Sequence, residues 1–234
     1  MPSPIPEYAQ KTLELLDKHG LSGNLPKIFT EADEPTLQYL VSDQLTYLIK
    51  KQLRTGTIPE QLITETETIL NTINQKPKLA KAYLETASYL PPSDAINILK
   101  QSGEIFQKAD DPDNVIDTYL TLGHIQVENQ DPDALHSFIV ANIYTRNHKN
   151  PTTETKEKLV KGLIEVAKLR KNMGKSMNAY SSIMEAVRVA ESIEDDDLIE
   201  LAVLQQAVFL QNDGERERVI ELISRYPKIK EKYL

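Results

Sequence analysis

The sequence predicts an all-α protein in which antiparallel helix pairs stack as an α-solenoid. Three observations predict this class. Apolar residues recur three and four positions apart in nearly every long segment, no segment alternates apolar and polar residues for long, and Pro and Gly mark regular breaks. Spacings of three and four place residues on one face of a helix, whereas a half-buried strand needs alternation.

Proline and acidic residues mark the expected helix starts. Asp111-Pro112-Asp113 and Asp131-Pro132-Asp133 each place an acidic N-cap before a proline at the first helical position, where the missing N–H costs nothing. Thr57-Ile58-Pro59-Glu60 fits a capping box, and Asn150-Pro151-Thr152 resembles the Asp-Pro starts. With Gly20, Gly56, Gly174 and Gly214 at expected helix ends, these signals predict helices at 6–19, 36–54, 58–74, 77–90, 93–109, 112–128, 132–147, 153–172, 176–193, 196–211 and 215–226.

A pattern of three residues repeats in the second helix of each expected pair. It has a small residue, a bulky residue four positions later and another small residue three positions after that, all on one helical stripe. Small outer residues let a neighbouring helix approach closely. The copies are Ala95, Leu99 and Ser102; Ala134, Phe138 and Ala141; Ala179, Ile183 and Ala186; and, more weakly, Val219, Ile223 and Tyr226.

The preceding helix of each pair carries a matching small residue. Ala167 and Ala207 stand twelve positions before the stripes in the last two copies, and Gly123 stands eleven before in the second. Tyr83 breaks the pattern in the first copy. Five positions before each stripe, a turn should join the two helices of the pair. Three of the four copies have a residue there that suits a turn, namely Asn129, Gly174 and Gly214, and the exception is Leu90.

In these features the chain resembles the tetratricopeptide repeat family, over about residues 77–227. The copy from Leu163 to Ala186 matches best, and Pro151 and Pro227 follow second helices as prolines commonly do in that family. The stripes begin 39, 45 and 40 residues apart, against about 34 in the family. The resemblance therefore implies a divergent tetratricopeptide-like array over residues 76–234.

Residues 1–75 fit the pattern less well. They are interpreted as an N-terminal helical cap or a degenerate repeat, because terminal repeats diverge where one face meets water. A separate small helical domain is the alternative, since Leu21–Glu34 has the character of a connection.

Composition narrows the classes of function. With 27 basic and 35 acidic residues the net charge is −8, so neither nucleic acid nor a membrane surface is an expected partner. The chain has no cysteine, which removes disulfides and thiol catalysis. No apolar stretch is long enough to span a membrane, and residues 1–6 lack the pattern of a signal peptide, so a cytoplasmic location is expected.

The sequence carries no recognisable catalytic, cofactor or metal motif, so no enzyme is predicted. None of the histidines at 19, 124, 136 and 148 has a metal-binding partner three or four positions away. His124 and His136 would face each other only across a turn, and packing or surface roles are favoured for them. The run Glu194–Asp197 lacks the pattern of a calcium loop and is interpreted as a turn that caps the next helix.

A basic segment suggests a binding surface. Lys156, Lys158, Lys161, Lys168, Arg170, Lys171 and Lys175 stand against only Glu157 and Glu165. The family resemblance implies that the first helix of each pair lines a concave groove. In the third copy the groove positions would be Lys161, Ile164, Lys168, Lys171 and Asn172; in the fourth they would be Leu201, Leu204, Val208, Gln211 and Asn212.

These expectations favour a non-catalytic scaffold that binds a protein or an acidic, partly apolar peptide in the groove. The alternative is a regulatory or sensing module that binds nucleic acid or a small anion through helix 156–175, whose affinity would fall steeply with salt. Two further interpretations stay open. The lysines can be an ordinary solvated surface, in which Lys168 or Lys171 pairs with acids on a neighbouring helix, and the chain can form a homodimer.

Overall fold

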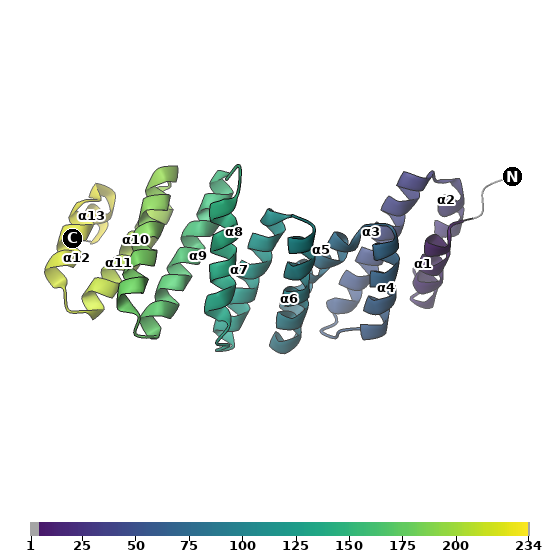
Figure 1. The fold of residues 1–234 in the computed structure, drawn as a ribbon, viewed down its shortest axis with the longest axis horizontal. Helices are drawn as coiled ribbons and strands as arrows, with labels where there is room; N and C mark the ends of the chain where they lie inside the picture. Colours follow the sequence, from purple (N-terminus) through teal and green to yellow (C-terminus); the bar gives the residue numbers. More distant parts are fainter. Residues whose placement is uncertain (1–4, 234) are drawn as a thin grey trace. The chain divides into compact units, whose positions relative to one another are not determined.

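The protein is all-α, as predicted. The computed structural model describes residues 5–233, which form thirteen α-helices and one short 3₁₀ helix and no strand (Figure 1). The helices are α1 (Glu7–Lys18), α2 (Leu25–Glu31), α3 (Glu34–Leu53), α4 (Glu60–Thr72), α5 (Lys76–Thr86), η1 (Ala87–Tyr89), α6 (Pro92–Lys108), α7 (Pro112–Glu128), α8 (Ala134–Asn147), α9 (Thr153–Asn172), α10 (Ser176–Ile193), α11 (Asp196–Asn212), α12 (Arg216–Ser224) and α13 (Pro227–Tyr233).

Two short helices were not predicted. The segment taken as a connection contains α2, with Pro26 in its first turn. Pro227, expected to follow the last helix, instead begins α13. Each of these helices has seven residues, fewer than are needed to display a convincing helical period.

Some predicted caps were correct and others were not. The backbone N–H groups of Asn114 and Leu198 donate to the carboxylates of Asp111 and Asp195, at 3.2 and 3.0 Å. The capping box at residues 57–60 is wrong, because α4 begins after Pro59 without a side-chain cap. Thr152, rather than Asn150, caps α9 by accepting the N–H of Thr155.

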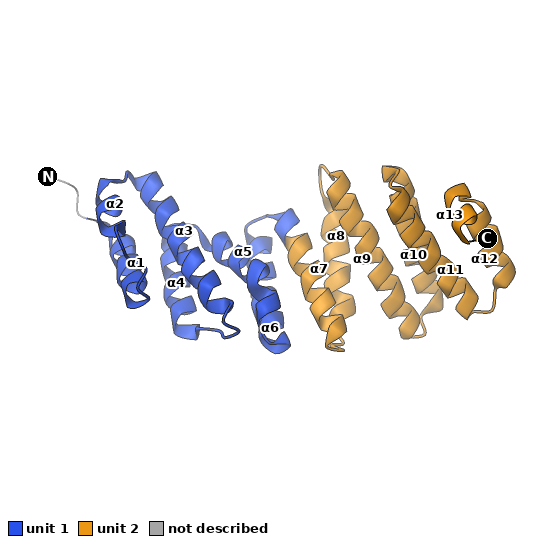
Figure 2. Ribbon diagram, turned by 180° about the vertical axis from the view of Figure 1, so that it is seen from behind, with its two compact units in different colours: residues 1–114 blue, residues 115–234 orange. Residues whose placement is uncertain are grey.

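The chain divides into two compact units, residues 1–114 and 115–234 (Figure 2). The division falls within α7. This division reflects which residues contact one another. The boundary expected at residue 75 separates the N-terminal cap from the repeat array, which is a different property, and it stays a prediction. Each unit is described by itself below.

Unit 1 is a stack of helices in which α1 contacts α3 and α4, α3 contacts α5, and α5 contacts α6. Polar side chains join these neighbours. The Lys78 ammonium donates to the Ser42 hydroxyl at 2.7 Å, and the Ser102 hydroxyl donates to the Ala80 carbonyl at 2.8 Å. An ion pair between Lys50 and Glu85 adds a second link from α3 to α5.

Unit 2 has two helical layers. In one layer Lys158 of α9 pairs with Asp117 of α7 at 2.8 Å, and α9 contacts α11. In the other, the guanidinium of Arg146 on α8 bonds both carboxylate oxygens of Glu185 on α10, at 3.0 and 2.9 Å. Helix α13 joins the first layer, because Lys232 pairs with Glu200 of α11 at 2.6 Å. Consecutive helices therefore alternate between layers, as stacked antiparallel pairs require.

The repeated stripes form the core, as predicted. All nine residues of the first three copies are buried, and in the fourth copy Ile223 is buried while Val219 and Tyr226 pack against the same cluster. Gly123 lets α7 approach α8 closely, since a Cβ built there would lie 2.9 Å from the Phe138 ring. Small and large residues thus interlock between the helices of a pair.

Candidate functional site

The predicted binding residues on α9 have different environments. Lys161 is exposed, and no ion pair joins it to another described residue. Lys168 lies two turns further along and is partly exposed, with its ammonium 2.8 Å from the Glu165 carboxylate. Asn172 is exposed at the end of the helix. These three residues lie on one exposed side of α9.

Two residues expected in the groove are not available there. Ile164 is only 2% exposed and belongs to the hydrophobic core of unit 2. The side chain of Lys171 is 15% exposed, because its ammonium pairs with Asp213 and lies 5.3 Å and 5.7 Å from the ring centroids of Tyr180 and Phe209. The prediction of a groove-facing position is wrong for Ile164, and Lys171 joins α9 to the end of α11.

Helix α11 presents an apolar strip beside α9. Leu201 is 47% exposed and Val208, two turns later on the same face, is 46% exposed. Leu204 between them is half-buried, and Gln211 and Asn212 at the end of the helix are exposed. Apolar side chains of this size are usually buried, and two of them on one face leave a surface suited to a partner.

The basic character of α9 is reduced by its neighbours. Lys158 pairs with Asp117 and Glu154, and Arg170 donates to the Ser182 hydroxyl at 2.7 Å. Together with Lys168 and Lys171, four of the seven basic side chains already donate hydrogen bonds to described groups. Lys171 thus pairs with an acid from a neighbouring helix, as one interpretation expected, whereas Lys168 pairs with Glu165 on its own helix. These contacts leave less charge for an external anion.

The Lys171–Asp213 contact also perturbs titration. The hydrogen bond from Lys171, followed by one from the Tyr180 hydroxyl, lowers the pKa of Asp213 below its usual range. Burial, followed by the hydrogen bond to Asp213, raises the pKa of Tyr180. Because these shifts follow from a local structural contact, they are not a sign of catalysis.

The other candidates from the sequence have structural contacts. The His124 ring packs edge-to-face on Phe138, with centroids 5.1 Å apart, which confirms a packing role. Asp195, in the acidic run, caps α11 as expected.

Within residues 5–233 no three histidine or acidic side chains gather as a possible metal site. None of the helices described there is long and apolar enough to cross a membrane.

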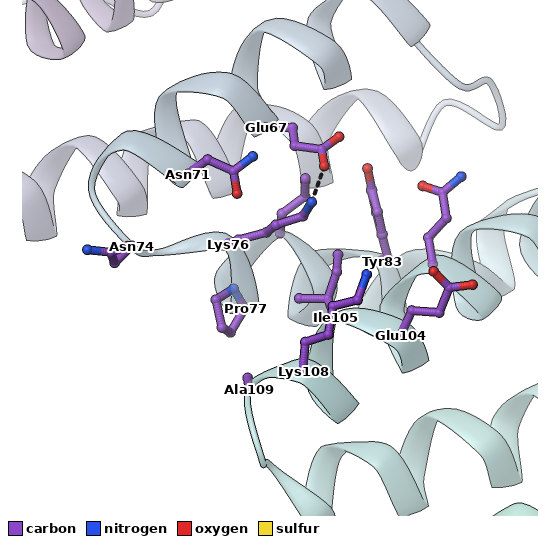
Figure 3. A pocket seen from close by; sticks show the side chains of 12 residues that line it. Glu67, Asn71, Asn74, Lys76, Pro77, Tyr83, Glu104, Ile105, Lys108 and Ala109 are labelled. Carbon is purple, nitrogen blue, oxygen red and sulfur yellow. Dashed lines mark hydrogen bonds and ion pairs between the residues drawn. The ribbon is translucent and has the colours of Figure 1, made fainter.

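Unit 1 contains a cavity that the sequence analysis did not predict. Tyr83, the residue that breaks the small-residue pattern, is 1% exposed and lines a cavity of about 510 Å³ between α4, α5 and α6 (Figure 3). At the comparable place the second pair has Gly123, against which Phe138 packs. The clue in the sequence is that Tyr83 is bulky at a position where the close approach of two helices needs a small residue.

Similarity to known proteins is limited to the fold. No family model and no curated protein matches the sequence. The crystal structure of BtubC (BKLC) from P. vanneervenii is similar, with a TM-score of 0.59 and 12% identity, over 97% of this chain and 92% of that chain. The de novo designed helical repeat protein DHR64 aligns over 96% of this chain and 94% of its own, at 14% identity, but its TM-score of 0.22 is too low to support an argument.

Proposed function

We propose that the chain is a divergent tetratricopeptide-like scaffold, without catalytic activity, that binds a protein or peptide segment on the face formed by α9 and α11. The observation that carries this proposal is the pair of exposed apolar residues on α11, Leu201 and Val208. Covering such side chains removes apolar area from water, and fully burying one contributes about 1.5–3 kcal/mol.

The chemistry of the face favours an acidic, partly apolar segment. Lys161 and Lys168 lie on α9 next to the apolar strip, and Lys161 is free to pair with a carboxylate of the partner. The exposed amides of Asn172, Gln211 and Asn212 can donate to and accept from an extended backbone. A partner held in this way would use apolar contacts for affinity and the lysines for orientation.

The alternative of a nucleic-acid or small-anion site on α9 has weaker support. Three of its seven basic side chains pair with Asp117, Glu165 and Asp213. A second copy of this chain is another candidate partner for the apolar strip, and light scattering over a range of protein concentrations distinguishes it from a different protein.

The proposal is tested by affinity capture from the cells that make the protein. The tagged wild type is compared with the double variant Leu201→Asp and Val208→Asp, and with Met184→Asp, which changes a 59% exposed side chain on α10 in the other layer. Circular dichroism first establishes that all three are folded.

We expect wild type and the Met184 variant to retain the same proteins. The double variant should lose them by at least about tenfold, because charged groups cannot be buried in an apolar contact without a large cost. Equal capture by all three proteins would refute a partner site on α11.

A further inference from the structure

We propose a second binding site, in unit 1, for an extended basic peptide segment that lies between α4 and α6 and inserts an arginine or lysine side chain beside Tyr83. This site is independent of the α9–α11 face, and either can fail without the other. It consists of the 510 Å³ cavity and an adjoining cavity of 660 Å³, whose walls share Glu67 and Gln101.

The two cavities lie next to each other along α4 and α6, because Glu67 and Gln101 line both of them. Helix α4 contributes Glu67 and Asn71 to one wall of the first cavity, and α6 contributes Gln101 and Glu104 to the other. The second cavity continues towards the start of both helices, where Glu60 and Asp94 line it. An opening that follows two helices for several turns suits a chain segment better than a compact small molecule.

The hydroxyl of Tyr83 is the strongest sign of a missing partner. The side chain is almost completely buried, and no hydrogen bond joins its hydroxyl to another described residue. Figure 3 shows the hydroxyl end of Tyr83 pointing into the same space as the Glu67 carboxylate. The oxygen keeps some contact with the open cavity, where it can donate to or accept from a ligand group.

Across the two cavities four acidic side chains stand against two basic ones, which favours a cationic ligand. Glu67 is already paired with Lys76. Of the remaining charged groups, Glu60, Asp94 and Glu104 are acidic and only Lys108 is basic. No ion pair joins these three acids to another described residue. A guanidinium or ammonium in the first cavity would donate to Glu104 and to the Tyr83 oxygen, and a second basic residue would reach Asp94 or Glu60.

Amide side chains supply what a peptide backbone needs. Asn71, Asn97 and Gln101 line the opening, and none of their side chains has a hydrogen bond to another described residue. Each amide offers two donor hydrogens and a carbonyl acceptor, the same pair of functions that an extended backbone presents. Carboxylates together with free amides therefore favour a basic peptide over an isolated cation.

The probe for the test is a short, acetylated, fluorescein-labelled peptide in which arginine and serine alternate, titrated with the full chain and followed by fluorescence anisotropy. The variants are Tyr83→Phe, which removes only the hydroxyl, and Glu104→Gln. Their matched controls are Tyr47→Phe and Glu31→Gln, which make the same changes at exposed positions outside the opening.

We expect Tyr83→Phe and Glu104→Gln each to raise the Kd roughly three- to tenfold, the range for loss of one hydrogen bond. Neither control should change it by more than about twofold. Tyr83→Phe should also shift the unfolding temperature by less than about 3 °C, because no intramolecular hydrogen bond is lost. These results together would support the site.

Four outcomes would overturn the proposal. In the first, the peptide does not bind at millimolar protein. In the second, Glu31→Gln weakens peptide binding as much as Glu104→Gln does, which indicates general attraction to an acidic protein. In the third, the matching peptide of glutamate and serine binds more tightly. Free arginine amide that binds as tightly as the peptide would also overturn it, because the amide-lined part of the opening would then contribute nothing.

Discussion

The Lys171 ammonium lies 2.6 Å from both carboxylate oxygens of Asp213, and the hydroxyl of Tyr180 donates to the same carboxylate at 2.9 Å. This contact joins the end of α9 to the end of α11, the two helices whose exposed residues form the face proposed to bind a partner.

Stability should depend on pH through this contact. Asp213 has a lowered pKa in the folded protein, so its contribution is present above the pKa of the unfolded chain and is lost as the pH falls through the folded value. Asp213→Asn should therefore be less stable than wild type at neutral pH, and the difference should shrink from about pH 4 downward. Thermal unfolding at pH 7 and pH 3 measures it. In a Lys171→Met background the Asp213→Asn change should have less effect at pH 7; an undiminished effect would contradict this account.

The C-terminal end of α10 is strained. Glu194 adopts a left-handed backbone conformation, with φ of 54°, which costs a non-glycine residue roughly 1 kcal/mol. Gly174 and Gly214 occupy similar helix ends without that cost. Glu194→Gly should raise the free energy of unfolding by about 0.5–1 kcal/mol in urea titration. Glu157→Gly, inside α9, should lower the free energy of unfolding by a similar amount. If this control also stabilised the protein, relief of backbone strain at Glu194 would not be the explanation.

Gly123 and Phe138 form an interlocking pair that a double-mutant cycle can test. Phe138→Ala should cost about 3–5 kcal/mol, and Gly123→Ala about 1–3 kcal/mol, because the added methyl group meets the ring. In the double variant the methyl group fills part of the space that the ring has left, so the total should fall below the sum by at least about 0.5 kcal/mol. Combining Gly123→Ala with Phe209→Ala, whose ring packs against Tyr180 elsewhere in unit 2, should give additive losses. Additivity in both pairs would show that Gly123 does not contact Phe138.

Lys168 should matter for binding and hardly at all for folding. Lys168→Glu replaces an exposed ion pair with Glu165 by two like charges three residues apart, so the free energy of unfolding should change by no more than about 0.5 kcal/mol. Affinity for an acidic partner should fall. A loss of stability as large as that of Phe138→Ala would mean that the buried and exposed faces of the helices have been assigned incorrectly.

The core was predictable because burial is encoded in periodicity. Ala134, Phe138 and Ala141 lie on one stripe of an ideal helix, and any arrangement of paired helices has to bury such a stripe. Leu201 and Val208, which only the family resemblance assigned to a groove, lie on one face of α11 and are exposed.

The errors in the candidate site came from contacts between helices, which periodicity does not describe. Position on a helix does not say which neighbour covers a side chain. Ile164 is buried because the core extends to it, and Lys171 is engaged because Asp213 follows the end of α11. The pairing partners are about forty residues away in sequence, so no local pattern reveals them.

The opening in unit 1 was missed for a related reason. A single bulky residue, Tyr83, in a position otherwise occupied by Gly or Ala is visible in the sequence, but its consequence depends on how α4 and α6 are placed beside it. A departure from a repeat can mean a degenerate copy or a binding site, and only the surrounding side chains distinguish the two.

The most direct test of the proposed binding face is photocrosslinking in the cells that make the protein. A photoreactive amino acid is placed at Val208 in one variant and at Met184, which is similarly exposed in the other layer, in a second. Our account predicts a discrete crosslinked species, containing a different protein, at position 208 and none at position 184. Equal crosslinking at both positions, or products at 184 alone, would contradict it.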